Sequence, residues 1–428
     1  MTTARAVARD VLVRVDGGAY SNLVLPAALR RTDLDARDRA FATDLVYGTL
    51  RARRRVDAVL APHTRRPLDD VDPPVRALLR LGAYQLLSGV APHAAVGETV
   101  AAAPGRARGY VNAVLRAVAA APPPAPASFA EALSYPDWIV ARLTADLGEP
   151  DARAALAAQN EAPLVWLRPN RARTDPDDLA AELAAGGATV TRGGLVPDAV
   201  AVRGAGDPAA LPAVREGRAT PQDQASQTVV AMVEAQPGDR VLDVAAAPGG
   251  KATGLGERVG AGVVVAVDRH PGRLGQVGPA ARRLGLPAVR PVLADGRALP
   301  VAPATIDRAL VDAPCSGLGV LRRRPEARWR TEAPAAALTE LQAALVLAAA
   351  AAVRPGGRLV YSVCTLTAAE TVGVAARVLD ALGGAVRVVE PPGPPWRPAG
   401  PGALLLPQDA DTDGMFVLVV ERVDAPVR

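Results

Sequence analysis

The chain has 428 residues, enough for two or three domains of about 150 residues each. Half of the residues are hydrophobic, so buried cores can form, and the formal net charge of +5 is a modest basic excess compatible with a nucleic-acid partner. The two cysteines and three histidines have no metal-ligand spacing, which argues against a zinc site. We expect no bound metal.

The N-terminal stretch MTTARAVARDVLVRV is charged throughout and lacks the apolar run of a signal peptide. The most apolar run of the chain, Ala343 to Val353, is shorter than the roughly 20 residues that a bilayer-spanning helix needs. We therefore expect a cytoplasmic protein that does not use a membrane.

Residues 1 to 120 are predicted to be entirely helical, because apolar residues recur at helical spacing from Val75 to Leu86 and from Val111 to Val118. Arginines gather on the opposite faces of the predicted helices. Such clusters are typical of a solvated helix face, and contact with RNA phosphates is an equally open alternative. These arginines are Arg30, Arg31, Arg37, Arg39, Arg51, Arg53, Arg54 and Arg55.

A Pro-rich stretch, APPPAPAS at 121–128, predicts a semi-rigid linker and a domain boundary, and we place the linker at 121–134. Residues 135–236 then predict a helical and α+β subdomain that contacts RNA. Its patterns are two helices up to Asn160, a strand in PLVWLRPNR, a helix in DPDDLAAELAAGG, short strands near Thr189 and Val200, and a helix within 218–233.

From residue 237 to 428, strand and helix patterns alternate, which predicts an α/β domain with a mostly parallel sheet and helices on both faces. The predicted helices include 272–284, 335–353 and 368–382. The last two strand patterns, VRVVE and MFVLVVE, have no helix between them, so we expect an antiparallel pair at the end of the chain. The predicted protein is thus multidomain, with an all-α N-terminal domain, a small α+β subdomain and a C-terminal α/β domain.

The stretch VLDVAAAPGGK, residues 241–251, predicts a buried strand, a turn of small residues and a helix that begins near Lys251. Backbone N–H groups and a helix N-terminus would then face the crevice at the strand's carboxyl end. The stretch matches neither the phosphate-binding P-loop nor a Gly-x-Gly-x-x-Gly fingerprint. With Asp268 at the end of the next strand, placed to accept hydrogen bonds from ribose hydroxyls, the stretch resembles the S-adenosylmethionine loop of class I methyltransferases.

Other polar residues also fall at predicted strand ends, where open α/β sheets bind their ligands: Asp295, Asp312, Cys315 and Cys364. Lys251 is the only lysine in a chain with 48 arginines, which suggests a site that needs a compact ammonium group.

The two cysteines suggest a specific chemistry for a methyltransferase. C5 of a pyrimidine is too weak a nucleophile to attack a sulfonium methyl unaided, but a thiolate that adds to C6 makes C5 enamine-like. Such an enzyme needs a reactive thiol, a hydrogen-bonding group at the ring and a base for the C5 proton. Asp312 is the predicted ring contact, and we expect Lys251 to lie close enough in the fold to orient Asp312 or the base.

Several stretches carry a family resemblance. RDRAFATDLVYGTLR, LLRLGAYQLL, HAAVGETV and GYVNAVLR resemble NusB, a helical RNA-binding antitermination factor. DVAAAPGGK, DAPCSGLGVLRRRPEARWR, YSVCTLTAAE and LLPQDADTDGMFVLVVER resemble the bacterial Sun/Fmu (RsmB) family of small-subunit (16S) ribosomal RNA cytosine-C5 methyltransferases. The resemblance covers nearly the whole chain.

The resemblance implies a role for each site residue. Cys364 is the nucleophile and Cys315 assists release of the methylated product. Asp268 contacts the ribose of S-adenosylmethionine, Asp295 its adenine, and Asp312 its methionine end and the target base. The remaining cofactor contacts come from Ala245, Ala246, Ala247, Pro248, Gly249, Gly250 and Lys251. The implied partner is small-subunit ribosomal RNA before subunit assembly is complete, and we expect a monomer.

Two positions depart from the family pattern: Ala245 stands where Cys is common, and Val363 stands where Thr is common. A rival assignment makes Cys315 the nucleophile, because Pro314-Cys315 has the form used by DNA cytosine-C5 methyltransferases. Two other functions also stay open, an RNA-binding assembly or antitermination factor whose methyltransferase domain is inactive, and a small-molecule methyltransferase.

Overall fold

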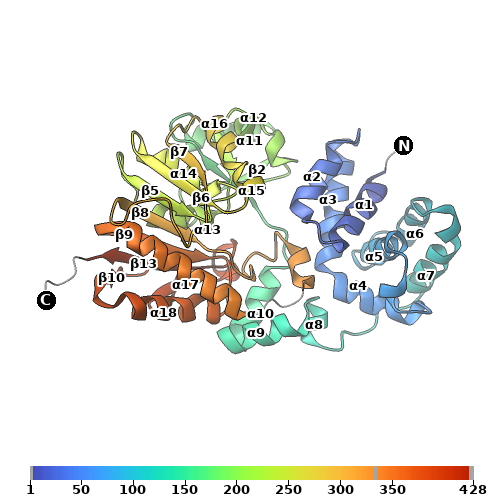
Figure 1. Ribbon diagram of the computed structural model, residues 1–428. Helices are drawn as coiled ribbons and strands as arrows, with labels where there is room; N and C mark the ends of the chain where they lie inside the picture. The colour runs from blue at the N-terminus through green and yellow to red at the C-terminus, as the bar shows by residue number, and fades with distance from the viewer. Residues whose placement is uncertain (1–2, 331–334, 424–428) are drawn as a thin grey trace. The chain divides into compact units, whose positions relative to one another are not determined.

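The computed structural model describes residues 3–330 and 335–423 (Figure 1). The chain forms two compact units, each assembled from separate stretches of sequence. The first unit is helical and contains Met1–Ala145, Gln159–Ala162 and Leu321–Thr331. The second contains Asp146–Ala158, Pro163–Val320 and Glu332–Arg428, and includes both β-sheets.

The N-terminal helices begin where the sequence supplies capping groups. The Thr3 hydroxyl accepts a hydrogen bond from the Ala6 amide, the Asp35 carboxylate accepts one from Asp38, and prolines stand in the first turns of two later helices. The predicted all-helical region is confirmed. Its helices are α1 (Ala4–Asp16), α2 (Ser21–Leu29), α3 (Ala36–Arg51), α4 (Arg53–Leu60), α5 (Pro73–Leu87), α6 (Pro92–Ala101) and α7 (Arg108–Ala120).

Helix α5 is the centre of this unit. The predicted apolar face is buried except at Leu86, which is half-buried, and Leu81 and Arg80 on other sides of the helix are buried as well. The Arg80 guanidinium is compensated by Asp57, at 2.7 and 2.9 Å, and by Asp16 at 3.1 Å. The prediction of one buried face was therefore too narrow, because neighbouring helices surround α5.

The helical unit also contains α8 (Phe129–Ala132), the first part of α9 (Asp137–Leu147), and a later segment, Leu321–Arg330, with a 3-10 turn at Pro325–Trp329. The Glu326 carboxylate in this segment accepts hydrogen bonds from the Ser21 amide and hydroxyl, at 3.3 and 2.7 Å. Residues 321–330 have no apolar periodicity, so their place among the N-terminal helices was not predicted.

Three of the predicted surface arginines, Arg53, Arg54 and Arg55, are engaged within the helical unit. Arg54 pairs with Asp137 at 2.9 Å, and Arg55 pairs with Glu131 at 3.1 Å. The Arg53 guanidinium lies 5.2 Å from the centre of the Trp329 ring. These three arginines therefore do not form the solvated face that was one of the two interpretations, whereas Arg31 and Arg37 are exposed.

The predicted α+β subdomain is confirmed in the second unit. It is a four-stranded antiparallel sheet in the order β2-β3-β1-β4, with α11 (Pro176–Ala185) packed against it. Its strands are β1 (Val165–Pro169), β2 (Thr189–Arg192), β3 (Val200–Arg203) and β4 (Ala219–Pro221). Strand β4 was not predicted, because it has only three residues. The flanking helices are α10 (Glu149–Ala158), α12 (Pro212–Arg215) and α13 (Gln224–Met232).

The larger sheet has the order β11-β12-β13-β9-β8-β5-β6-β7, with β10 also paired to β13. Strands β9, β8, β5, β6 and β7 are parallel and form the predicted core of the α/β domain. These strands are β5 (Arg240–Val244), β6 (Val263–Asp268), β7 (Val289–Leu293), β8 (Ile306–Asp312) and β9 (Val353–Val363). The chain order reverses at β5, which has β6 on one side and β8 on the other.

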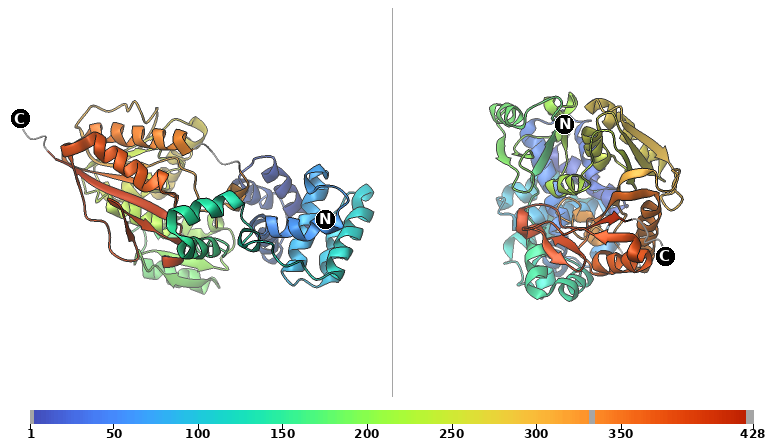
Figure 2. Two further views of the ribbon diagram at one scale, coloured as in Figure 1. Left: turned by 90° about the horizontal axis from the view of Figure 1, so that it is seen from below. Right: turned by 90° about the vertical axis from the view of Figure 1, so that its left-hand side faces the viewer.

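Helices cover both faces of this sheet, as predicted. One core contains α13, α14 (Gly250–Val259) and α16 (Val277–Leu284), and the other contains α17 (Ala335–Ala352) and α18 (Val374–Leu382). Figure 2 shows the two orange helices α17 and α18 along one face of the strands. Among the described residues, α17 alone is long and apolar enough to cross a membrane, but Ala343, Val346 and Ala349 pack it into the core under the sheet.

The C-terminal strands refine the prediction. β10 (Val386–Val388) and β13 (Met415–Arg422) are antiparallel, as expected. However, β13 also pairs with β9, and a hairpin of β11 (Arg397–Ala399) and β12 (Gly402–Leu405) precedes it. The hairpin was missed because its strands are short and lie among Pro and Gly. The predicted helix 272–284 is interrupted, with α15 (Pro271–Leu274) ahead of α16.

We predict that Leu310→Ala destabilises the second unit, because Leu310 is fully buried in β8 and its loss leaves a cavity. The expected loss is about 2 to 5 kcal/mol, measured as a lower urea midpoint. Leu293→Ala is the matched control, because Leu293 is 58% exposed, and it should leave the midpoint nearly unchanged. Equal midpoints for the two variants would contradict this account of the core.

Candidate functional site

The predicted strand-end residues gather at one edge of the large sheet. Parallel strands end at the same edge, and β5, β6, β8 and β9 are neighbours in the sheet. The reversal of strand order beside β5 opens a crevice at that edge, which is where open α/β sheets bind their ligands. The predicted residues that follow these four strands are therefore close to one another.

The turn after β5 has a constrained backbone. Ala245 and Gly249 both have positive φ, 60° and 106°, and α14 begins at Gly250. A Cβ on Gly249 would lie 3.2 Å from the Cα of Val277, so the chain needs glycine there. The turn delivers the first N–H groups of α14, which have no partners within the helix, to the crevice.

Asp268 ends β6 beside this turn. Its carboxylate accepts hydrogen bonds from the backbone amides of Ala247, at 3.2 Å, and His270, at 2.8 Å. Arg273 donates to the carbonyl of Ala247 at 2.9 Å, which ties the turn to α15. These contacts fix the orientation of the Asp268 carboxylate relative to the 245–250 turn.

Asp295 lies beyond the end of β7 and is only loosely part of the cluster. Its carboxylate pairs with Arg297, with a shortest separation of 2.6 Å, and this pair lowers its pKa to about 2. The residue before Asp295 lies beside the end of β6, because the Ala294 amide donates a hydrogen bond to the Asp268 carbonyl at 3.2 Å. Asp295 is therefore a fixed carboxylate on the rim of the site.

Lys251 and Asp312 form a partly buried ion pair of 2.7 Å that joins α14 to the end of β8. Burial alone would lower the pKa of Lys251, but the charge and hydrogen bond of Asp312, together with the charges of Cys364 and Asp243, more than offset it, so the pKa is raised and the ammonium is retained. The second oxygen of Asp312 accepts a hydrogen bond from the Ser362 hydroxyl at 2.9 Å. The only lysine of the chain thus fixes the position of Asp312, the residue at which the loop with Cys315 begins.

Asp243 was not assigned a role from the sequence, yet it is the most perturbed acid of the edge. It is fully buried, and neither carboxylate oxygen has a hydrogen-bonding partner. Burial, and then the charge of Asp312, raise its pKa to about 8. The sequence showed its place at a strand end, but not that its neighbours would leave it unpaired.

Cys315 and Cys364 come together. Their sulfur atoms are 3.4 Å apart, in loops that follow the adjacent strands β8 and β9. The hydrogen bond with Cys364 and burial raise the pKa of Cys315 well above its usual value, and the charges of Glu370 and Asp312 act in the same direction. Cys315 is therefore a thiol at neutral pH.

Glu370 organises both cysteine loops, a role that sequence reasoning missed although the residue closes the YSVCTLTAAE motif. This buried carboxylate accepts hydrogen bonds from the Ser316 amide and the Gln342 side chain, each at 2.9 Å, and from the hydroxyls of Thr365 and Thr367 at 3.4 and 3.1 Å. It therefore links the residue after Cys315 to the residue after Cys364. An acid at this spacing from a strand-end cysteine was the available signal.

Gly319 brings the loop after Cys315 against the backbone of the Cys364 loop. Its amide donates to the Cys364 carbonyl at 3.0 Å, and a Cβ there would lie 2.2 Å from the Gly414 carbonyl oxygen. Glycine is therefore required. Among the described residues, no three His, Cys, Asp or Glu side chains gather in a way that could hold a metal ion.

Comparison with protein families divides the chain into three matches. Residues 2–120 match the NusB family, residues 135–208 match the ferredoxin-like domain of RsmF/B-like methyltransferases, and residues 230–420 match the 16S rRNA methyltransferase RsmB/F. A putative methyltransferase of Mycobacterium tuberculosis is 40% identical, over 98% of this chain and 96% of its own length. The chain belongs to the RsmB/F family of 16S ribosomal RNA methyltransferases.

Other relatives agree with this membership. A probable ribosomal RNA small subunit methyltransferase B of Synechocystis is 36% identical, over 86% of this chain and 87% of its own. The ribosomal RNA small subunit methyltransferase B of Klebsiella pneumoniae is 33% identical, over 96% of both chains. In fold, the crystal structure of PH0851 matches with a TM-score of 0.86 over 99% of both chains, at 24% identity.

The predicted family, the fold class and the cofactor are thereby confirmed. The fold is a NusB domain, a small domain and a Rossmann-like methyltransferase domain, and the methyl donor is S-adenosylmethionine. A second solved structure, titled NSun6 from Pyrococcus horikoshii with SFG, matches over 68% of this chain and 99% of its own, with a TM-score of 0.58 and 20% identity. The roles of individual residues stay predictions.

We predict that Cys315 resists alkylation in the folded protein. Its raised pKa leaves almost no thiolate near pH 7.5, and the thiolate is the reactive species. Peptide mass spectrometry after iodoacetamide treatment should show modification of Cys315 at least about tenfold slower than in the same chain unfolded in urea. Modification at similar rates in the two states would contradict the account of this thiol.

Proposed function

We propose that this chain methylates C5 of a cytidine in 16S ribosomal RNA, through a covalent bond between Cys364 and C6 of the base. The observation that carries the proposal is the pair of thiols 3.4 Å apart, next to the Lys251–Asp312 ion pair at the sheet edge. A methyltransferase that acts on oxygen or on an exocyclic nitrogen has no need of two thiols in its site.

The 245–250 turn and Asp268 fit S-adenosylmethionine. The turn presents the N-terminus of α14, and Asp268 is fixed by two backbone amides, which suits an acceptor for ribose hydroxyls. We assign the cofactor contacts to residues 245–251, with Asp268 at the ribose, Asp295 at the adenine and Asp312 at the methionine end. When bound, S-adenosylmethionine supplies an electrophilic methyl group.

The chemistry proceeds at the base. The Cys364 thiolate adds to C6, which forms an S–C6 bond and moves the electrons of the C5=C6 bond to C5. C5 then forms a bond to the methyl carbon as the methyl–sulfonium bond breaks. Loss of the C5 proton to a base restores the C5=C6 bond and expels the Cys364 thiolate. Cys315 assists this release.

The match of residues 230–420 to the RsmB/F methyltransferases supports this division of roles over the rival one, which rests on the Pro314-Cys315 pair alone. The hydrogen bond between the two thiols and burial raise the pKa of Cys315, which favours its protonated form. A protonated Cys315 beside Cys364 is suited to donate a hydrogen bond to the departing sulfur.

Asp312 is the proposed contact to the base. Its carboxylate is held by Lys251 and Ser362 and is 32% exposed at the side chain, so it can accept a hydrogen bond from the exocyclic amino group of cytosine. Uracil has a carbonyl oxygen at that position, which would face the carboxylate without a hydrogen. The same ion pair therefore favours cytosine over uracil.

The family also suggests where the protein acts, in what oligomeric state, and how the chain divides into domains. We propose a cytoplasmic monomer that acts on 16S RNA before subunit assembly is complete, with the division of the chain at 1–120, 121–134, 135–236 and 237–428. The extents of the three family matches support these boundaries. An assembly factor with an inactive methyltransferase domain would have no reason to keep the Lys251–Asp312 pair and both thiols in contact.

The two cysteines can be separated by substitution. Cys364→Ala should abolish transfer of tritiated methyl to unmodified 16S RNA, because no S–C6 bond can form. Cys315→Ala should accumulate a covalent protein–RNA adduct that survives denaturing electrophoresis. Activity of Cys364→Ala together with no adduct in Cys315→Ala would overturn the assignment.

We predict that Asp268→Asn weakens S-adenosylmethionine binding by about tenfold or more, measured by calorimetry. In the variant, an amide NH2 replaces one carboxylate oxygen. That NH2 would face either a backbone N–H or the ribose hydroxyls, and whichever group it faces would have no hydrogen-bond acceptor. Asp380→Asn is the control, because Asp380 is exposed on α18. If both variants bind the cofactor like the parent chain, Asp268 is not a ribose contact.

A further inference from the structure

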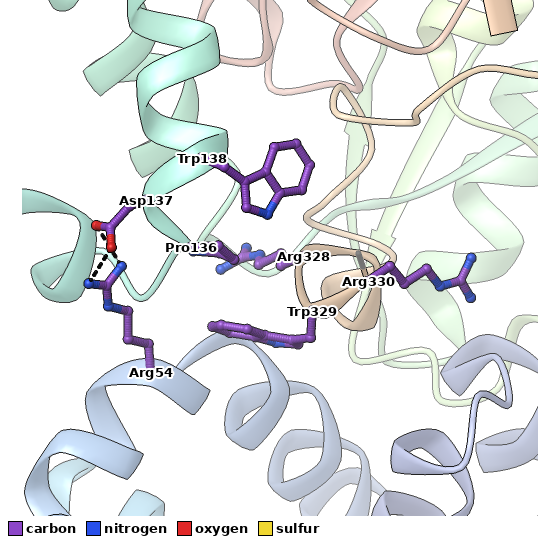
Figure 3. A pocket seen from close by; sticks show the side chains of 7 residues that line it. All are labelled: Arg54, Pro136, Asp137, Trp138, Arg328, Trp329 and Arg330. Carbon is purple, nitrogen blue, oxygen red and sulfur yellow. Dashed lines mark hydrogen bonds and ion pairs between the residues drawn. The ribbon is translucent and has the colours of Figure 1, made fainter. Parts of the chain in front are cut away.

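A pocket of about 430 Å³ lies within the helical unit, on residues that the methylation chemistry does not use (Figure 3). Its size is within the range of small-ligand sites. Three arginines, two tryptophans and one acid account for most of its wall. The lining residues, here called the Trp pocket, are Arg54, Pro136, Asp137, Trp138, Arg328, Trp329 and Arg330.

Trp329 is held as a rigid wall of the Trp pocket. Its indole N–H donates to the Leu50 carbonyl at 3.0 Å, and the Arg53 guanidinium lies 5.2 Å from the ring centre. The ring is nevertheless only half-buried. An aromatic ring that is fixed at its edge, yet still lines a pocket, is a pre-organised surface for stacking, because little side-chain entropy remains to be lost when a ligand binds.

Trp138 is the second aromatic wall. It projects from α9, and Figure 3 shows its indole and that of Trp329 bordering the same space from different elements. It too is half-buried. Trp166 and Trp396 are 5% and 4% exposed and lie in cores, so the two pocket tryptophans are the ones that a ligand in solution can reach.

The charge of the Trp pocket is positive. Asp137 is already paired with Arg54, through contacts of 2.9 and 3.1 Å. Arg328 is fully buried, and among the described residues it donates to neutral oxygens of Asn160 at 2.7 Å, Gln159 at 2.9 Å and Arg51 at 3.3 Å, while its Nε has no partner. Its guanidinium also lies 4.0 Å from the centre of the Tyr135 ring.

Within the described residues, Arg328 and Arg330 have no carboxylate partner. Burial lowers the pKa of Arg328 to about 10, so the side chain still carries its charge at neutral pH. Arg330 is exposed and lies over the Tyr20 ring, 4.4 Å from its centre. A buried arginine without a carboxylate partner favours an anionic ligand.

We propose that the Trp pocket binds one unpaired nucleotide of the RNA substrate, with its base against the tryptophans and its phosphate at the exposed Arg330, where the buried charge of Arg328 adds to the attraction. Aromatic side chains bind every base through its face, and arginine neutralises the backbone. The proposal rests on RNA being the substrate. It adds a contact outside the catalytic edge, on the last residues of the DAPCSGLGVLRRRPEARWR motif that begins at Asp312.

Steady-state methylation by the full-length chain tests the pocket. Trp138→Ala should raise KM for 16S RNA about tenfold, with kcat at saturating RNA and KM for S-adenosylmethionine unchanged, because the pocket binds substrate and touches no reacting atom. Trp138→Phe keeps an aromatic face and should recover most of the affinity. Arg106→Ala, an exposed arginine of the helical unit outside the pocket, should change KM less than about twofold.

A binding measurement keeps this proposal separate from the proposed reaction. A single-stranded oligoribonucleotide of mixed sequence should quench the tryptophan fluorescence of the wild-type chain, and Arg330→Ala should weaken that binding and reduce its salt dependence. Quenching without any methylation by the wild-type chain would refute the proposed reaction and support the pocket.

Three results would overturn the pocket. One is an unchanged KM in both Trp138→Ala and Arg330→Ala while methylation proceeds. Another is fluorescence quenching that persists undiminished in a Trp138→Ala, Trp329→Phe double variant whose circular dichroism matches the wild type. The third is a Trp138→Ala variant that binds free RNA like the wild type but binds the assembled small subunit more weakly. That result would assign the pocket to a protein partner.

Discussion

The ion pair between Lys251 and Asp312 is the interaction on which the site depends. The Lys251 side chain is only 11% exposed, and a buried ammonium without a partner costs several kcal/mol, so Lys251 requires the Asp312 carboxylate. Their contact ties the first turn of α14 to the end of β8, and Ser362 extends the tie to β9. Three neighbouring strand ends are thereby held at fixed separation, and both cysteine loops start from them.

Much of this arrangement follows from local pattern. A buried strand that ends in a small-residue turn, acids at the ends of successive parallel strands and a lone lysine place the site at one sheet edge before any coordinates are considered. Contacts between residues that are far apart in the sequence cannot be predicted from local pattern. Nothing local shows that Asp243 would be left without a hydrogen bond, or that Glu370 would reach Ser316, because those outcomes depend on which loops meet. Likewise, residues 321–330 belong to the helical unit through the Glu326–Ser21 bonds, which no periodicity reveals.

The chain therefore separates two tasks. The second unit supplies the chemistry, with a rigid turn, oriented acids and two thiols whose loops share Glu370 as a common anchor. The helical unit supplies a positively charged pocket with aromatic walls, of which Trp329 and Arg328 come from the end of the motif that contains Cys315. In this account, affinity for RNA and reactivity toward one base are carried by different side chains and can be changed independently.

The central claim is that Cys364 bonds to C6 of the base. RNA that contains 5-fluorocytidine tests it directly, because fluorine at C5 cannot leave as a proton does and the adduct cannot resolve. After reaction with S-adenosylmethionine and digestion, mass spectrometry should find the methylated, fluorinated nucleotide on the peptide that carries Cys364. Attachment to the Cys315 peptide, or no attachment to either peptide, would contradict the account.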